Sequence, residues 1–91
     1  MNRRPPILIT YEVLSVLHKF GKMNISQLCL RTRLSHQKLR MLLDTLINAN
    51  FIARQSNGGS DVYVLTPKGR KMFLKLKEYI EVLAEAGLIK E

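Results

Sequence analysis

The sequence has little cysteine, few acidic residues and no long apolar run. Among 91 residues there are one cysteine, no tryptophan and only seven Asp and Glu. The single cysteine, Cys29, excludes a disulfide within the chain and is typical of a reducing compartment. No apolar run approaches the roughly 18 residues of a membrane span, and no signal-peptide pattern opens the chain. We therefore expect a soluble cytoplasmic protein with no membrane partner.

Positive charge is what the sequence has in excess. Fifteen Lys and Arg residues against seven Asp and Glu give a net charge of +8. A compact body with this excess repels itself, which indicates an anionic partner. Residues 1–77 hold 14 of the 15 cations and three carboxylates, a net of +11, whereas residues 78–91 carry −3. One end of the molecule is therefore predicted to face a polyanion. Because 91 residues form one small domain with a thin core, a partner subunit is a natural supplement.

Residue patterns for catalysis or metal binding are weak. Four of the seven carboxylates lie in residues 78–91, and no Ser/His/Asp or Cys/His constellation is evident. His18, His36 and one cysteine are too few and too irregularly spaced for a metal site. Gly58-Gly59 lacks the spacing of a phosphate-binding loop. We expect no enzyme, no cofactor and no metal, with Cys29 acting as a small buried hydrophobe rather than a redox sensor or intersubunit disulfide.

Hydrophobic periodicity predicts three helices in the first half of the chain. Residues 1–6 are expected to form a flexible basic arm, because two prolines end it. A helix over 7–20 carries two apolar stripes and ends at Gly21. A short helix follows to about residue 32, with Asn24 or Ser26 as its N-cap. The third helix, over 36–49, has Ser35 as N-cap and Asn50 as a left-handed C-cap.

The pattern then changes to a hairpin and one long helix. Two β-prone runs, 51–55 and 61–65, flank a five-residue loop that contains Asn-Gly. Thr66-Pro67 supplies an N-cap and a first-turn proline for a helix that runs to about residue 86. Its apolar residues follow the 4-3-4-3-4 spacing of a coiled-coil seam. They are Gly69, Phe73, Leu76, Ile80, Leu83 and Gly87. We expect its distal half to overhang the domain and pack on another chain.

This order of elements is that of a winged helix-turn-helix, a mainly helical α+β fold. The segment 25–51 resembles the helix-turn-helix core of winged-helix regulators, and Tyr63-Val64-Leu65-Thr66-Pro67-Lys68-Gly69 resembles their "Tyr-x-Leu-Thr-x-Lys-Gly" join between wing and last helix. The likeness covers about residues 7–87 and is strongest to MarR-like and PadR-like repressors and small dimeric winged-helix proteins of archaea and their viruses. It implies a DNA-binding domain over 7–66, a dimerisation helix over 67–87 and a tail over 88–91.

The resemblance also implies which residues meet double-stranded DNA. The third helix would present its exposed N-terminal residues to base edges in the major groove. These are Ser35, His36, Gln37, Lys38, Arg40 and Met41. Gln37 suits adenine and Arg40 suits guanine, while Asp44 either accepts from cytosine or lies one turn beyond the DNA. Contacts to the backbone would come from the turn, the wing and the start of the last helix. These are Arg31, Arg33, Arg54, Asn57, Gly58, Gly59, Ser60, Lys68, Arg70 and Lys71.

A homodimer through the first and last helices is the expected assembly. Its interface residues are Tyr11, Leu14, His18, Phe73, Leu76, Ile80 and Leu83. Family analogy would place a small-molecule effector near Tyr11, His18, Phe73 and Tyr79, but no residue pattern supports one. The leading hypothesis is a homodimeric transcriptional regulator that reads DNA sequence. The alternatives are an architectural protein that binds DNA with little sequence preference and a winged-helix module that binds other proteins.

Overall fold

Residues 6–89 are described by a computed structural model, apart from the side chain of Asn57. Most of the expected basic arm, residues 1–5, and the end of the tail, residues 90–91, lie outside this description. The element order is α1 (Pro6–Phe20), α2 (Ile25–Thr32), α3 (His36–Asn48), β1 (Ile52–Asn57), β2 (Ser60–Leu65) and α4 (Pro67–Glu85). The predicted fold class, helices with one β-hairpin, is confirmed. Helix α1 starts at Pro6, one residue earlier than predicted. Proline is tolerated there because it lacks a backbone N–H, and an N–H at the first helical position would have no acceptor within the helix.

Local capping chemistry fixes the ends of α2 and α3. Asn24, one of the two predicted caps, is the N-cap of α2. Its side chain accepts a hydrogen bond from the Gln27 backbone N–H at 2.8 Å, and the Gln27 side chain accepts one from the Asn24 backbone N–H at 2.9 Å. Ser35 caps α3 as predicted, with its Oγ accepting from the Lys38 N–H at 3.2 Å. Asn50 has the predicted left-handed backbone, at φ 65°. The chain therefore leaves α3 in the direction of the hairpin.

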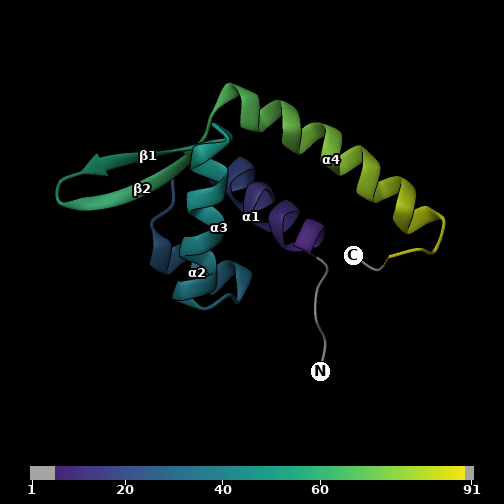
Figure 1. Ribbon diagram of the computed structural model, residues 1–91, viewed down its shortest axis with the longest axis horizontal. Helices are drawn as coiled ribbons and strands as arrows, with labels where there is room; N and C mark the ends of the chain where they lie inside the picture. Colours follow the sequence, from purple (N-terminus) through teal and green to yellow (C-terminus); the bar gives the residue numbers. More distant parts are fainter. Residues whose placement is uncertain (1–5, 90–91) are drawn as a thin grey trace.

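The hairpin is longer than the sequence pattern predicts. Strands β1 and β2 pair antiparallel from Ile52↔Leu65 to Asn57↔Ser60, so the predicted five-residue loop is wrong. Only Gly58 and Gly59 form the turn, and their φ values of +61° and +90° suit a two-residue turn that matches the strand twist. Strand pairing therefore extends the hairpin away from the helices (Figure 1).

The segment before α2 adds a backbone contact to the base of this hairpin. Met23 pairs with Tyr63, through an N–O distance of 3.2 Å in one direction and 2.8 Å in the other. This pairing sets the start of α2 beside β2. The central core lies between α1, α2, α3, the hairpin base and α4. Its buried side chains are Val13, Leu14, Leu17, Met23, Leu28, Leu39, Leu43, Leu46, Ile52, Tyr63 and Phe73.

The join between β2 and α4 is held by contacts from the motif residues. The Thr66 hydroxyl accepts from the Gly69 N–H at 2.9 Å and donates to the Asn50 carbonyl at 2.6 Å. The Thr66 backbone N–H also donates to the Phe51 carbonyl at 3.1 Å. Gly69 lies so close to Phe51 that a Cβ at this position would overlap the Phe51 carbonyl oxygen. The start of α4 is therefore fixed against the end of α3 and the residue before β1.

Helix α4 lies along α1 (Figure 1). An aromatic cluster joins the two helices. Phe73 stacks on Tyr11 with 5.6 Å between ring centroids and on His18 with 4.6 Å. Phe73 is only 4% exposed, and Leu14 and Ile80 are fully buried in the single chain. These three positions have almost no surface left for a partner, so their expected place in a dimer interface is corrected to the protomer's own core. The packing at Ile80 also means that the distal half of α4 does not overhang completely.

Candidate nucleic-acid interface

The first half of α3 divides sharply into a buried and an exposed face. Leu39 is fully buried, and Leu43 and Leu46 continue the same face into the core. The six predicted base-reading residues, Ser35, His36, Gln37, Lys38, Arg40 and Met41, are all exposed. Met41, the apolar member of this set, is 65% exposed. The structure therefore leaves this face of α3 open.

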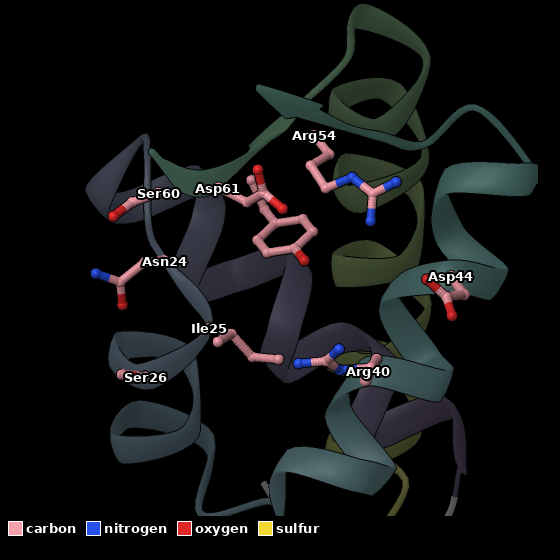
Figure 2. Close-up of a pocket in the computed structure, with 9 residues that line it drawn as sticks. Asn24, Ile25, Ser26, Arg40, Asp44, Arg54, Ser60 and Asp61 are labelled. Carbon is pink, nitrogen blue, oxygen red and sulfur yellow. The ribbon is translucent and has the colours of Figure 1, made fainter. Parts of the chain in front are cut away.

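A polar hollow of about 440 Å³ lies between α3, the start of α2 and the hairpin (Figure 2). Three elements that are separate in the sequence meet there because Met23 pairs with Tyr63 and holds α2 beside β2. The residues that line it are Asn24, Ile25, Ser26, Arg40, Asp44, Arg54, Ser60, Asp61 and Tyr63. Arg40, Arg54 and Ser60 are thus three predicted DNA contacts that the fold brings to one place.

Arg40 and Arg54 approach the hollow from opposite elements, α3 and β1, with their guanidinium groups between the hairpin and the helix (Figure 2). Within the part of the chain that the structure describes, neither has a hydrogen bond or an ion pair. Asp44 and Asp61 line the same hollow and are likewise unpaired among the described residues. The hollow therefore holds two guanidinium groups and two carboxylates, all open to solvent.

Other predicted backbone contacts are exposed around this face. Arg33 has a left-handed backbone, at φ 60°, between α2 and α3. Gly58 and Gly59 form the hairpin tip, whereas the side chain of Asn57 lies outside the described residues. Arg70 and Lys71 are exposed in the first turns of α4 but do not line the hollow. The structure leaves these positions accessible and does not bring all of them to one site.

Two predicted backbone contacts, Arg31 and Lys68, are engaged within the protein. The Arg31 guanidinium lies 4.2 Å from the centre of the Phe20 ring. Lys68 Nζ donates to the Ala49 carbonyl at 3.1 Å and lies 5.0 Å from the centre of the Phe51 ring. Lys68 thereby stabilises the C-terminal end of α3, where a positive charge interacts favourably with the helix dipole. Lys68 of the join motif therefore has a structural role, which the sequence analysis did not predict.

An apolar surface follows the side of α4 that α1 leaves uncovered. A groove of about 520 Å³ is lined by Phe51, Lys68, Lys71, Met72, Lys75, Leu76 and Tyr79. Met72, Leu76, Tyr79 and Leu83 repeat at 4-3-4 spacing, a second heptad stripe beside the buried one. We call these four residues the outer stripe. Sequence reasoning placed Leu76 and Leu83 in an interface but missed Met72 and Tyr79, although their spacing is visible in the sequence.

No helix in the described range is long and apolar enough to cross a membrane. Across residues 6–89, no cluster of three His, Cys, Asp or Glu is placed to hold a metal. Cys29 is a half-buried free thiol packed against the core. Tyr11 and His18, two of the residues expected near an effector, both stack on a third, Phe73.

Comparisons with known structures agree with this geometry. Sso10a-2, a DNA-binding protein from Sulfolobus solfataricus, superimposes with a TM-score of 0.83 at 17% identity over 91% of this chain and 85% of that one. The transcriptional regulator BldR from the same organism gives 0.82 at 18% identity over 89% of this chain and 60% of that one. Bordetella bronchiseptica BpsR, whose DNA binding is regulated by 6-hydroxynicotinic acid, gives 0.79 at 17% identity, covering 86% and 61%. At these identities the likeness is one of fold.

Sequence comparison supplies the family. A search of curated proteins finds no matching sequence. The winged helix-turn-helix family matches residues 3–84, which include α1 through most of α4. Together with the capped α2–α3 pair, the hairpin and the α4 join, this match shows that the chain belongs to the winged helix-turn-helix family.

Proposed function

We propose that the protein binds double-stranded DNA sequence-specifically as a homodimeric transcriptional regulator, with α3 in the major groove and the hairpin on the flanking backbone. The observation that carries this proposal is the exposed N-terminal face of α3. It lies beside a hollow lined by two arginines that have no partner among the described residues. Arginine forks match phosphate and base edges, and polar helix faces of this kind fit the major groove. A DNA partner also accounts for the net charge of +8 and implies an intracellular location.

Base reading is assigned to the outermost residues of α3. Gln37 and Met41 are four residues apart and lie on adjacent turns of one exposed stripe. A glutamine amide pairs with adenine through two hydrogen bonds, and an apolar side chain contacts the thymine methyl group. Ser35, His36 and Lys38 surround them in the first turn, where a recognition helix meets the groove.

Site selection from a random duplex library tests sequence-specific binding. Two recognition helices related by a two-fold axis would lie roughly 34 Å apart, so the selected sites should be pseudo-palindromes with half-sites about one helical turn apart. Gln37→Ala should relax the preference at one or two positions per half-site, a loss of about 1–3 kcal/mol of discrimination at each. Asn48→Ala, an exposed amide at the far end of α3, is the matched control. Equal loss on every sequence would contradict base reading by Gln37.

The homodimer is supported by the outer stripe on α4. The stripe adjoins the apolar groove that starts at Phe51, and Tyr79 is 55% exposed. Heptad spacing is what lets two helices pack knobs into holes along their length. A second copy of the same helix carries the same stripe, so a two-fold axis would pair the stripes with each other. The dimer therefore uses Leu76 and Leu83 of the predicted seam, together with Met72 and Tyr79.

Sedimentation of two charge variants tests this interface. Tyr79→Glu places a charge in the outer stripe and should shift the protein to monomer at micromolar concentration. Leu74→Glu is the matched control, because Leu74 is 49% exposed on the same helix but lies roughly opposite Tyr79 at 100° per residue. Leu74→Glu should leave the dimer intact. The interface is wrong if both variants remain dimeric or if only Leu74→Glu dissociates.

Architectural binding with little sequence preference is the second candidate. It is favoured by exposed cations outside α3, such as Arg33, Arg70 and Lys71, which suit phosphates rather than bases. The site selection separates the two functions, because an architectural protein would enrich no sequence. Its affinity for genomic and random duplexes would also be equal at matched salt.

A further inference from the structure

We propose that the hollow between α3, the start of α2 and the hairpin seats one phosphodiester of the DNA backbone, held jointly by Arg40 and Arg54. Arg40 is then a positioning residue for the duplex rather than the reader of guanine that its place on α3 suggests. This inference rests on the proposed function and deepens it. It assigns the ligand chemistry of one pocket and changes the role of one recognition-helix residue.

The position of the hollow points to a backbone strand. It separates the helix assigned to the major groove from the hairpin assigned to the flanking backbone. A duplex that contacts both elements must pass a phosphate strand across the gap between them, because phosphate strands border every groove. Arg40 lines this gap from α3 and Arg54 lines it from β1 (Figure 2), so the proposal gives one phosphate group a guanidinium partner on each side.

The donors around the hollow suit a phosphate. Each guanidinium offers a planar fork that matches two phosphate oxygens, and neither has a partner within the described part of the chain. Tyr63 adds a third donor. Its side chain is 7% exposed and lines the hollow, yet its hydroxyl is neither hydrogen-bonded nor fully buried. Ile25 and Ser26, in the first turn of α2, bring the positive end of a helix dipole to the same place.

The two carboxylates of the hollow select a diester over a free anion. Asp44 and Asp61 balance the charges of Arg40 and Arg54, so the four side chains sum to zero. Free phosphate carries up to two negative charges and would face the two carboxylates with no contact outside the hollow to hold it there. A backbone diester carries one charge and is delivered by the rest of the bound duplex. The chemistry therefore favours DNA over inorganic phosphate.

Substitution of single DNA phosphates by uncharged methylphosphonates tests this proposed phosphate site, which we call the seat. Wild-type protein is titrated against duplexes that carry one methylphosphonate at successive positions of a half-site. One position should weaken binding about tenfold, as expected for the loss of a charge-assisted hydrogen bond. Arg40→Ala and Arg54→Ala should each weaken binding to unmodified duplexes. For each variant, the loss of affinity should be the same for every DNA sequence. Each should also lose most of its sensitivity to methylphosphonate at that same position.

The control and the overturning results are distinct. Lys77→Ala removes one exposed cation from α4, outside the hollow, and should keep the wild-type pattern of sensitivity. The seat is overturned if Arg40→Ala changes base preference at a defined position, or if Arg40 and Arg54 couple to different phosphates, and both results leave DNA binding standing. Saturable binding of inorganic phosphate to the free protein, abolished by Arg40→Ala, would also overturn it. Failure to bind any unmodified duplex would instead refute the proposed function.

Discussion

At the residue scale, the join between the hairpin and α4 shows why particular side chains occur there. Thr66 connects the first turn of α4 to the Asn50 carbonyl, and Lys68 reaches the Ala49 carbonyl beside it. Gly69 is required because α4 approaches Phe51 with no room for a Cβ. The motif was recognisable in the sequence, whereas these partners were not, since they lie 16 to 19 residues away along the chain.

Gly69→Ala should destabilise the protein by about 1–3 kcal/mol, the usual cost of forcing an extra carbon into a packed site. Helix propensity alone predicts the opposite sign, because alanine is favoured over glycine by about 1 kcal/mol inside a helix. Urea denaturation monitored by circular dichroism measures the free energy of unfolding of both proteins. The sign of the difference shows which of the two effects is larger. A variant as stable as the wild type or more so would show that α4 can move away from the Phe51 carbonyl at little cost.

At the element scale, α4 carries two heptad stripes, and the sequence could not show which one the protomer uses. Phe73 and Ile80 belong to the stripe that is buried within the protomer, whereas Met72 and Tyr79 belong to the outer stripe. Both have the 4-3-4 spacing of a seam, so spacing alone cannot choose between them. Three-dimensional packing decides, because Tyr11 and His18 lie seven residues apart on α1 and stack on the same Phe73 ring.

Phe73→Ala should therefore destabilise the protomer by about 3–5 kcal/mol, as expected for removal of a buried aromatic ring. Leu74→Ala, at the neighbouring exposed position, should change stability by no more than about 0.5 kcal/mol. Denaturant midpoints measured at several protein concentrations distinguish a core role from an interface role. If the effect of Phe73→Ala disappeared on dilution, Phe73 would belong to the dimer seam after all.

The elements themselves were largely predictable because their signals are local. Asn24, Ser35 and Thr66 cap helices through atoms three residues away, and these pairs are visible in the sequence. The hairpin was predicted too short, because a turn confined to Gly58-Gly59 depends on strand pairing across the ladder. The polar hollow was not predicted at all, since it depends on Met23 pairing with Tyr63, forty positions away.

At the scale of the whole molecule, the chain forms a flat body with principal extents of 46 × 32 × 21 Å. The hairpin and the distal end of α4 extend in different directions from the helical core (Figure 1). The two regions have separate tasks in the proposed assembly. There, the face formed by α3, the hollow and the hairpin would contact DNA, while the outer stripe of α4 would contact a second copy. Glu78, Glu81 and Glu85 lie on α4 in the second region, where no DNA contact is proposed.

The salt dependence of DNA binding tests this account most directly. Fluorescence anisotropy of a labelled duplex would be measured with the wild-type protein between about 50 and 200 mM salt. If the dimer makes 6–10 phosphate contacts, affinity should fall by about 10³–10⁵ over this range, and log affinity should decrease linearly with log salt. Replacement of Arg40 and Arg54 by alanine should make the slope shallower. Weak binding at every salt concentration, or an affinity that barely changes with salt, would contradict DNA binding and favour a protein-interaction module.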